Sequence, residues 1–331
     1  MKNMEEEYKI QIKDLAVQYH TDMGVAKAVN RIDLGIRRGE AVGLVGESGS
    51  GKTTTALSIL RLLPKPAGKM ISGSIKYDGV ELTVLPEKKM RAIRGDKISM
   101  IFQNPLTSLN PVFTIREQIA MVFLQHSKMT NSQAVKQAGD MLEKVGIPRS
   151  RLSEYPHQLS GGMRQRVGIA AGLACTPGLL IADEPTTALD VTIQLQVLEL
   201  IKKLQKEYGT SLLMITHNLG IIAELCTQVA VMYAGTIVEK GPVQEVFISP
   251  RHPYTIGLLG SLPKLTGQRD RLTAIGGSAA SSNQLPSGCV FHPRCPQCTD
   301  LCRRKVPLMT KMIGERAIAC HLYAKEVQKL D

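Results

Sequence analysis

The sequence predicts an α/β fold with a largely parallel sheet, because strand-like runs alternate with helical ones along most of the chain. Three short apolar runs carry this prediction: residues 41–45 (AVGLV), 179–182 (LLIA) and 211–216 (SLLMIT). Each run has the length of a buried strand and is followed by glycine or by polar residues. With 331 residues, the chain is also long enough to bury a substantial core and to hold more than one folding unit.

Further elements follow from periodicity and turn residues. Residues 8–17 and 32–36 alternate between apolar and polar positions as strands do, and residues 54–63 form a helical run. Residues 105–156 change in character to helices, loops and polar turns. Residues 228–239 (QVAVMYAGTIVE) are typical of a hairpin that turns at an Ala-Gly pair.

The regular pattern loosens after residues 249–253 (SPRHP). The sequence that follows is rich in Pro, Gly and Ser, most clearly at residues 275–283 (IGGSAASSN). Because this composition is typical of loops and linkers, we place a domain boundary near residue 260. The sequence therefore predicts a main domain over residues 8–260 and an extension over residues 261–331.

The net charge of +12 favours an anionic neighbour: a nucleotide, a nucleic acid or a membrane surface. A generally basic solvated surface is the alternative that charge alone leaves open. The chain has no tryptophan and few, scattered aromatics, so it lacks the stacking pattern of single-strand binders and we expect no nucleic-acid partner. The N-terminus lacks a signal-peptide core, and no apolar run approaches the about 18 residues that span a bilayer. We therefore expect a chain that is soluble by itself and cytoplasmic.

Residues 46–53 (GESGSGKT) follow an apolar run and precede a helical run, which is the context of a phosphate-binding loop. Glycines let backbone N–H groups approach phosphate oxygens closely, and the helix N-terminus adds its dipole. Lys52 would reach the β- and γ-phosphates of a nucleotide, and Thr53 would place its hydroxyl on Mg²⁺. A glycine-rich turn that matches by chance is the alternative, which the flanking elements disfavour. The residues expected to bind ATP here are Gly46, Ser48, Gly49, Ser50, Gly51, Lys52, Thr53 and Thr54.

A pair of carboxylates follows another apolar run. Asp183 ends the sequence LLIAD, which puts its side chain beside a metal ion at the carboxyl end of the sheet, where ligands bind. The adjacent Glu184 is suited to polarise an attacking water. An Asp-Glu pair after an apolar run is a weak pattern by itself. It gains weight from the phosphate-binding loop upstream and a histidine downstream, so we expect Asp183 to bind ATP-Mg²⁺ and Glu184 to be catalytic.

Residues 159–166 (LSGGMRQR) lie between the phosphate-binding loop and residues 179–184 (LLIADE). With this ordered set of motifs, the chain resembles the ATP-binding subunits of ABC transporters over residues of about 8 to 260. The resemblance implies a P-loop NTPase fold of the ABC ATPase type, in which a RecA-like core carries an antiparallel β subdomain and a helical subdomain. It also implies an ATPase that uses ATP and Mg²⁺.

The resemblance adds residues to the expected site. Gln103 looks like the Q-loop glutamine, which contacts Mg²⁺ and the γ-phosphate and senses the transmembrane partner. His217 looks like the switch histidine, Tyr19 like the aromatic that stacks on adenine, and residues 188–190 like the D-loop. Each of the three side chains has an alternative interpretation. Gln103 would otherwise be a surface residue, His217 a hydrogen-bonded histidine at a strand end, and Tyr19 a packing residue.

The signature sequence implies a partner subunit. In the family it contacts the nucleotide held by the opposing subunit, so one chain cannot build a complete site. The signature residues expected to act in this way are Ser160, Gly161, Gly162 and Met163. Ser160 is also a good helix N-cap, and we expect it to serve both roles. Met163 stands where many ABC proteins carry glutamine.

Longer matches narrow the family. Residues 102–112, 155–163, 182–194 and 252–259 look like the oligopeptide/dipeptide uptake group, and most like its D-type ATP-binding subunit, which works beside an F-type subunit. The D-type pattern also has methionine at position 163. The resemblance implies a peripheral subunit at the cytoplasmic face of the membrane, two transmembrane permeases and an extracellular substrate-binding protein. Nickel, opine-metal and sugar importers belong to the same group, and the competing class is an ABC-type ATPase that acts on DNA or ribosomes.

The extension concentrates cysteines: Cys289, Cys295, Cys298, Cys302 and Cys320 lie within 32 positions. In a cytoplasmic chain this clustering favours a metal site over disulfides. On spacing alone, Cys295 and Cys298 form a zinc-knuckle turn that could recruit Cys302 and Cys320 or a nearby histidine. The resemblance instead implies that Cys289, Cys295, Cys302 and Cys320 match a family pattern that holds a [4Fe–4S] cluster in some members, with Cys298 left as an extra thiol. A zinc ion, or an extension without metal, stays open as an alternative.

Overall fold

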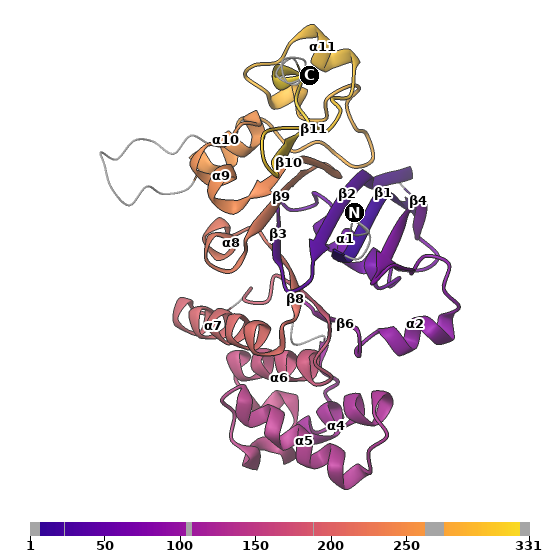
Figure 1. Cartoon of the computed structure of the whole chain (residues 1–331), viewed down its shortest axis with the longest axis vertical. Coiled ribbons are helices and arrows are strands. Elements are labelled where there is room, and N and C mark those ends of the chain that lie inside the picture. The colour runs from indigo at the N-terminus through magenta and orange to yellow at the C-terminus, as the bar shows by residue number, and fades with distance from the viewer. Residues whose placement is uncertain (1–6, 23, 104–107, 188, 262–274, 325–331) are drawn as a thin grey trace. The chain divides into compact units, whose positions relative to one another are not determined.

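The structure is a computed structural model that describes residues 7–22, 24–103, 108–187, 189–261 and 275–324. The chain forms two compact units that are each built from separate segments of sequence (Figure 1). Unit 1 consists of residues 1–10, 36–41 and 77–214, and unit 2 of residues 11–35, 42–76 and 215–331. The predicted division at residue 260 stays a prediction.

Unit 2 contains a sheet in which the strands are ordered β2 (Gly24–Arg37), β1 (Tyr8–Thr21) and β4 (Gly68–Tyr77). Strand β1 buries alternate residues on each side of Asp14, whose φ is 50° and where the alternation shifts by one position. Ile10 and Ile12 before it, and Leu15 and Val17 after it, are at most 1% exposed. This alternation confirms the strand predicted over residues 8–17 and extends it to Thr21.

A second sheet of unit 2 begins with β3 (Ala41–Val45), which pairs in parallel with β9 (Gln228–Tyr233). Strand β9 pairs antiparallel with β10 (Thr236–Pro242), and the turn residues Ala234 and Gly235 both have positive φ angles. Such angles at both central residues characterise the tight turn that joins twisted strands, so the predicted hairpin is confirmed. Beyond β10, the sheet is extended by two short strands. Strand β12 (Ala317–Ile318) pairs antiparallel with β10, and β11 (Thr310–Lys311) pairs antiparallel with β12.

The helices of unit 2 are short: α1 (Lys52–Ile59), α8 (Leu219–Leu225), α9 (Val243–Ile248), α10 (Pro253–Gly260) and α11 (Asp300–Arg304), with 3-10 turns at His292–Arg294 and His321–Tyr323. The prediction of a helix over residues 54–63 was wrong at both ends. The helix ends before Arg61, whose φ of 53° is not helical, and the prolines at 64 and 66 disfavour continuation.

Unit 1 contains the parallel pair β6 (Ile98–Ile101) and β7 (Leu179–Asp183), and most of β8 (Ser211–Thr216), which neighbours β7. Both β7 and β8 are buried at every position, which explains their continuous apolar sequences. The short strand β5 (Val80–Glu81) and the helices α2 (Glu87–Ile93) and α7 (Val191–Tyr208) complete this part of unit 1.

Helices, loops and turns follow from residue 108 onward, as predicted for residues 105–156, of which 105–107 lie outside the described residues. Helices α4 (Ile115–His126), α5 (Asn131–Lys144) and α6 (Gly161–Leu173) pack against one another (Figure 1). Short 3-10 turns cover Arg149–Ser153 and Pro156–Gln158. Thr114 and Thr130 start α4 and α5 with reciprocal capping boxes to Glu117 and Gln133.

No helix in the described part of the chain combines the length and the apolar character that crossing a bilayer requires.

Candidate nucleotide-binding and hydrolysis site

The glycine-rich loop leads from β3 directly into α1, as the sequence predicted. Gly46 and Gly51 have φ angles of 155° and 104°. A Cβ atom would lie 2.0 Å from the carbonyl oxygen of Met232 at Gly46, and 2.3 Å from that of Ala28 at Gly51. These distances are far below van der Waals contact, so only glycine fits at the two positions.

The side chain of Lys52 lies inside this loop and is 7% exposed. Its Nζ donates to the carbonyl oxygens of Gly46 at 2.8 Å and Glu47 at 2.9 Å. Ser50 is buried, whereas Ser48, Gly49 and Thr53 are exposed. The ammonium group supplies a positive charge within the loop, which is suited to the charge of a phosphate group.

Tyr19 reaches the same helix start from β1. Its hydroxyl lies 3.3 Å from the hydroxyl of Thr54. An aromatic ring at the beginning of α1 is compatible with the predicted contact to adenine, although this role stays a prediction.

In unit 1, the residues after β7 form the acidic part of the site. Asp183 is the last residue of the strand and is 2% exposed. Glu184 follows with a φ of 45°, a left-handed conformation that is uncommon for a glutamate. Its Oε2 accepts hydrogen bonds from Nε2 of Gln103 at 2.8 Å and from the hydroxyl of Thr187 at 3.0 Å. The structure therefore brings the predicted Q-loop glutamine onto the predicted catalytic carboxylate.

Thr187 was not among the predicted site residues. In the sequence, the position of Thr187 three residues after Glu184 is its sole indication. In the structure, the N–H of Thr187 also donates to the carbonyl oxygen of Glu184 at 3.2 Å. A local turn of this kind cannot be recognised from residue types alone.

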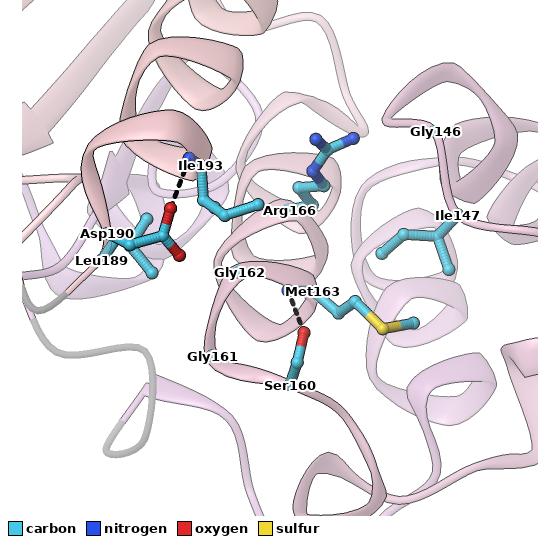
Figure 2. Close-up of a pocket in the computed structure, with 10 residues that line it drawn as sticks. All are labelled: Gly146, Ile147, Ser160, Gly161, Gly162, Met163, Arg166, Leu189, Asp190 and Ile193. Carbon is cyan, nitrogen blue, oxygen red and sulfur yellow. Dashed lines mark hydrogen bonds between the residues drawn. The ribbon is translucent and has the colours of Figure 1, made fainter.

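The signature residues border a pocket of about 600 Å³ in unit 1 (Figure 2). Ser160 is the N-cap of α6, and its hydroxyl accepts from the N–H of Met163 at 3.3 Å. Asp190 is the N-cap of α7 and accepts from the N–H of Ile193 at 3.0 Å. The pocket is lined by Gly146, Ile147, Ser160, Gly161, Gly162, Met163, Arg166, Leu189, Asp190 and Ile193. Two helix N-termini border the pocket, and their dipoles favour an anionic ligand, while the side chains of Arg166 and Asp190 contribute opposite charges.

Some predicted residues fall outside the described part of the chain: 104–107 of the stretch that follows Gln103, and 188 of the D-loop. His217 is described and exposed, directly after β8. The predicted ATP-site residues in unit 2 are Tyr19, residues 46–54 and His217, and those in unit 1 are Gln103, residues 160–163, Asp183 and Glu184.

The cysteine-rich extension belongs to unit 2. Cys289, Cys295, Cys302 and Cys320 line one pocket together with His252, Pro253, Phe291, His292, Gln297, His321 and Leu322. Burial raises the pKa of Cys320 to about 11 and raises those of Cys289 and Cys295 above the ordinary value. All seven cysteines are free thiols, and no group of three or more His, Cys, Asp or Glu residues in the described segments is arranged as a site for a metal ion.

Comparison with protein families agrees with this geometry. A model described as ABC transporter matches residues 29–187, and a model described as oligopeptide/dipeptide transporter, C-terminal region, matches residues 238–302. The second match begins in β10 and includes three of the pocket cysteines.

Individual relatives cover nearly the whole chain. The oligopeptide transport ATP-binding protein AppD of Bacillus subtilis is 48% identical over 96% of this chain and 97% of its own length. The oligopeptide transport ATP-binding protein OppD of Salmonella typhimurium is 45% identical over 96% of this chain and 95% of its own. Among solved structures, the ATP-binding cassette MJ0796, a dimer in a post-hydrolysis state with ADP and Pi, is 28% identical with a TM-score of 0.64, covering 71% of this chain and 98% of its own.

Proposed function

The chain belongs to the oligopeptide transport ATP-binding proteins of the ABC transporter family, and we propose that it hydrolyses ATP to energise the import of peptides through partner permeases. The observation that carries the proposal is the hydrogen bond between Gln103 and Glu184. It lies within a chain that matches peptide-transport relatives over almost all of its length. The peptide-transport relatives favour this function over that of an ABC-type ATPase that acts on DNA or ribosomes.

The residues of the site fit ATP and Mg²⁺. The hydroxyl of Thr53, the amide oxygen of Gln103 and the carboxylate of Asp183 are oxygen donors, which Mg²⁺ prefers. By the resemblance to the family, these three residues would hold the ion, whose charge would offset that of the phosphates. Lys52 would hold the phosphates through its charge.

Glu184 would orient the attacking water and accept its proton. Phosphoryl transfer needs little covalent help from a protein, so positioning and electrostatic stabilisation supply most of the catalysis. The hydrogen bonds from Gln103 and Thr187 to one carboxylate oxygen fix the orientation of the Glu184 side chain. His217 would contact the γ-phosphate as the switch histidine.

A second ABC subunit would complete the site. The signature residues line one pocket at the N-terminus of α6, and they would contact the γ-phosphate of a nucleotide bound by the partner. The dimeric state of the MJ0796 cassette supports this arrangement. We propose an F-type subunit as the partner, two membrane-spanning permeases that the pair drives from the cytoplasmic face, and an extracellular protein that delivers the peptide.

We propose that the pocket cysteines of the extension hold a [4Fe–4S] cluster, with Zn²⁺ as the alternative. The donor set fits, because four thiols from distant positions line one pocket and Cys₄ ligation suits such clusters. Among the described residues, no three His, Cys, Asp or Glu side chains are arranged to hold a metal ion, so either centre would require these thiols to draw closer together. A metal centre would supply the positive charge that stabilises buried thiolates. Metal binding would also stabilise the folded form of an extension that has little hydrophobic core of its own.

Reconstitution tests the function. The chain, its partner ATPase and the two permeases in proteoliposomes should hydrolyse ATP faster when the peptide-loaded binding protein is added. The isolated chain should show weak turnover that rises with protein concentration. Stimulation by a nickel-loaded binding protein but not by a peptide-loaded one would redirect the proposal to metal import.

A further inference from the structure

A salt bridge links the extension to the phosphate-binding loop within unit 2. The guanidinium of Arg294 donates two hydrogen bonds to the carboxylate of Glu47, one of 2.9 Å and one of 3.2 Å. The side chains are 7% and 28% exposed. A bidentate arginine–carboxylate pair is among the stronger and more directional contacts in proteins, and partial burial protects it from screening by salt.

Glu47 is held through its backbone as well. Its N–H donates to the hydroxyl of Tyr254 at 2.9 Å, and its carbonyl oxygen accepts from Nζ of Lys52 at 2.9 Å. The position of Glu47 therefore helps to fix where the ammonium group of Lys52 lies. A displacement of Glu47 would be transmitted to the lysine that is expected to bind the phosphates.

The extension holds Arg294 firmly in this orientation. Its Nε donates to the carbonyl oxygen of Gly276 at 2.8 Å, and its guanidinium lies 5.8 Å from the centre of the Tyr233 ring. Nearby, Phe291 packs edge-on against Tyr233 at 5.2 Å and Tyr254 at 5.4 Å between ring centres. One short segment of the extension thus supports both the arginine and the tyrosine that hold Glu47.

The charge of Glu47 makes this support relevant to binding. A carboxylate on a loop that receives a triphosphate repels its ligand unless a cation balances it. We propose that Arg294 is a positioning residue for nucleotide: it neutralises Glu47 and holds the loop in its ATP-binding form, so the extension is part of the nucleotide site. This inference rests on the proposed assignment of residues 46–53 as the phosphate-binding loop.

Titration of the full-length chain with Mg-ATP tests the proposal. Arg294→Met should raise the Kd for ATP on the order of tenfold, because it leaves the carboxylate of Glu47 uncompensated. Arg303→Met is the matched control, since it removes the same charge from an exposed position of the extension, and its Kd should equal that of the wild type. Arg294→Lys, which keeps the charge without the bidentate geometry, should give an intermediate Kd.

A second substitution separates the electrostatic role from a purely structural one. Glu47→Gln in the Arg294→Met background should restore most of the ATP affinity, because it removes the unbalanced charge. An unchanged Kd in Arg294→Met, or no recovery in the double variant, would overturn the proposal. Lys52→Ala should abolish ATP binding in every background. If it does not, the assignment of the phosphate-binding loop fails, which is a different outcome from failure of the Arg294 proposal.

Discussion

The side-chain amide of Gln103 donates a 2.8 Å hydrogen bond to the carboxylate of Glu184. Gln103 follows β6 and Glu184 follows β7, and these strands are parallel neighbours. Because the carboxyl ends of parallel strands meet at the same edge of a sheet, two residues that are 81 positions apart become partners. The contact links the glutamine expected to sense the permease to the carboxylate expected to activate water.

The first prediction concerns this contact. Gln103→Ala should lower kcat for ATP hydrolysis by about tenfold or more in the assembled transporter, because Glu184 loses a fixed orientation. Thr187→Val, which removes the other donor to the same oxygen, should give a smaller loss in the same direction. Steady-state hydrolysis measures both variants. Wild-type rates in Gln103→Ala would show that the hydrogen bond has no part in turnover.

A second prediction separates the two roles of Ser160. Ser160→Ala removes the N-cap of α6 and should lower the free energy of unfolding by about 1 kcal/mol. Ser160→Asp keeps a capping side chain, so its stability should stay near that of the wild type, whereas its negative charge should repel the partner's γ-phosphate and abolish hydrolysis by the assembled transporter. Denaturant unfolding and ATPase assays test the pair. Full activity in Ser160→Asp would contradict a role of the signature in phosphate contact.

The third prediction concerns pH. His252 is 1% exposed, and burial lowers its pKa from 6.5 to about 3. Between these two values the unfolded chain binds a proton that the folded chain does not, so stability falls as the pH falls below 6.5. The loss has a limiting slope of about 1.4 kcal/mol per pH unit for this one group.

A variant that keeps the local hydrogen bond provides the comparison. Nδ1 of His252 accepts from the N–H of Tyr254 at 3.0 Å as the N-cap of α10, and asparagine can replace this acceptor. His252→Asn should therefore lose less stability than the wild type between pH 7 and pH 5, as measured by denaturant unfolding. Parallel pH profiles for the two proteins would show that His252 does not contribute.

The fourth prediction concerns the cysteine pocket. Anaerobically purified protein should contain iron and sulfide, and Cys302→Ser should lose both and unfold at a lower temperature. Cys298→Ser is the matched control, because Cys298 lies in the same extension but does not line the pocket. Stoichiometric zinc in a protein that lacks the colour of an iron–sulfur cluster would show that the pocket binds zinc instead of iron. Equal behaviour of the two variants would refute a metal centre on the pocket cysteines.

Local patterns were sufficient to predict much of the fold and the site. The bounds of β3 and β8 were predicted correctly, because each is a continuous apolar run that ends at glycine or a polar residue. The hairpin of β9 and β10 followed from its Ala-Gly turn. The loop around Lys52 and the acidic pair after β7 were recognisable from residue types and their flanking elements.

Contacts between distant segments could not be predicted in this way. The salt bridge of Arg294 with Glu47 joins residues 247 positions apart. Nothing in the type of either residue indicates that the other is its partner. The two-residue strand β12 depends on pairing with the edge of β10 and has no pattern of its own. The early end of α1 depends on the left-handed conformation of Arg61, which the apolar run up to Leu63 does not indicate.

We propose that Glu184 activates water for ATP hydrolysis in a peptide importer. The most direct test is the rate of ATP hydrolysis by the reconstituted transporter with Glu184→Gln in this chain, measured together with ATP binding. We predict that this chain still binds ATP while its site loses hydrolysis by a factor on the order of 100 or more, because glutamine keeps the shape of the side chain but cannot accept a proton. Hydrolysis near the wild-type rate at the site of this chain would contradict the account.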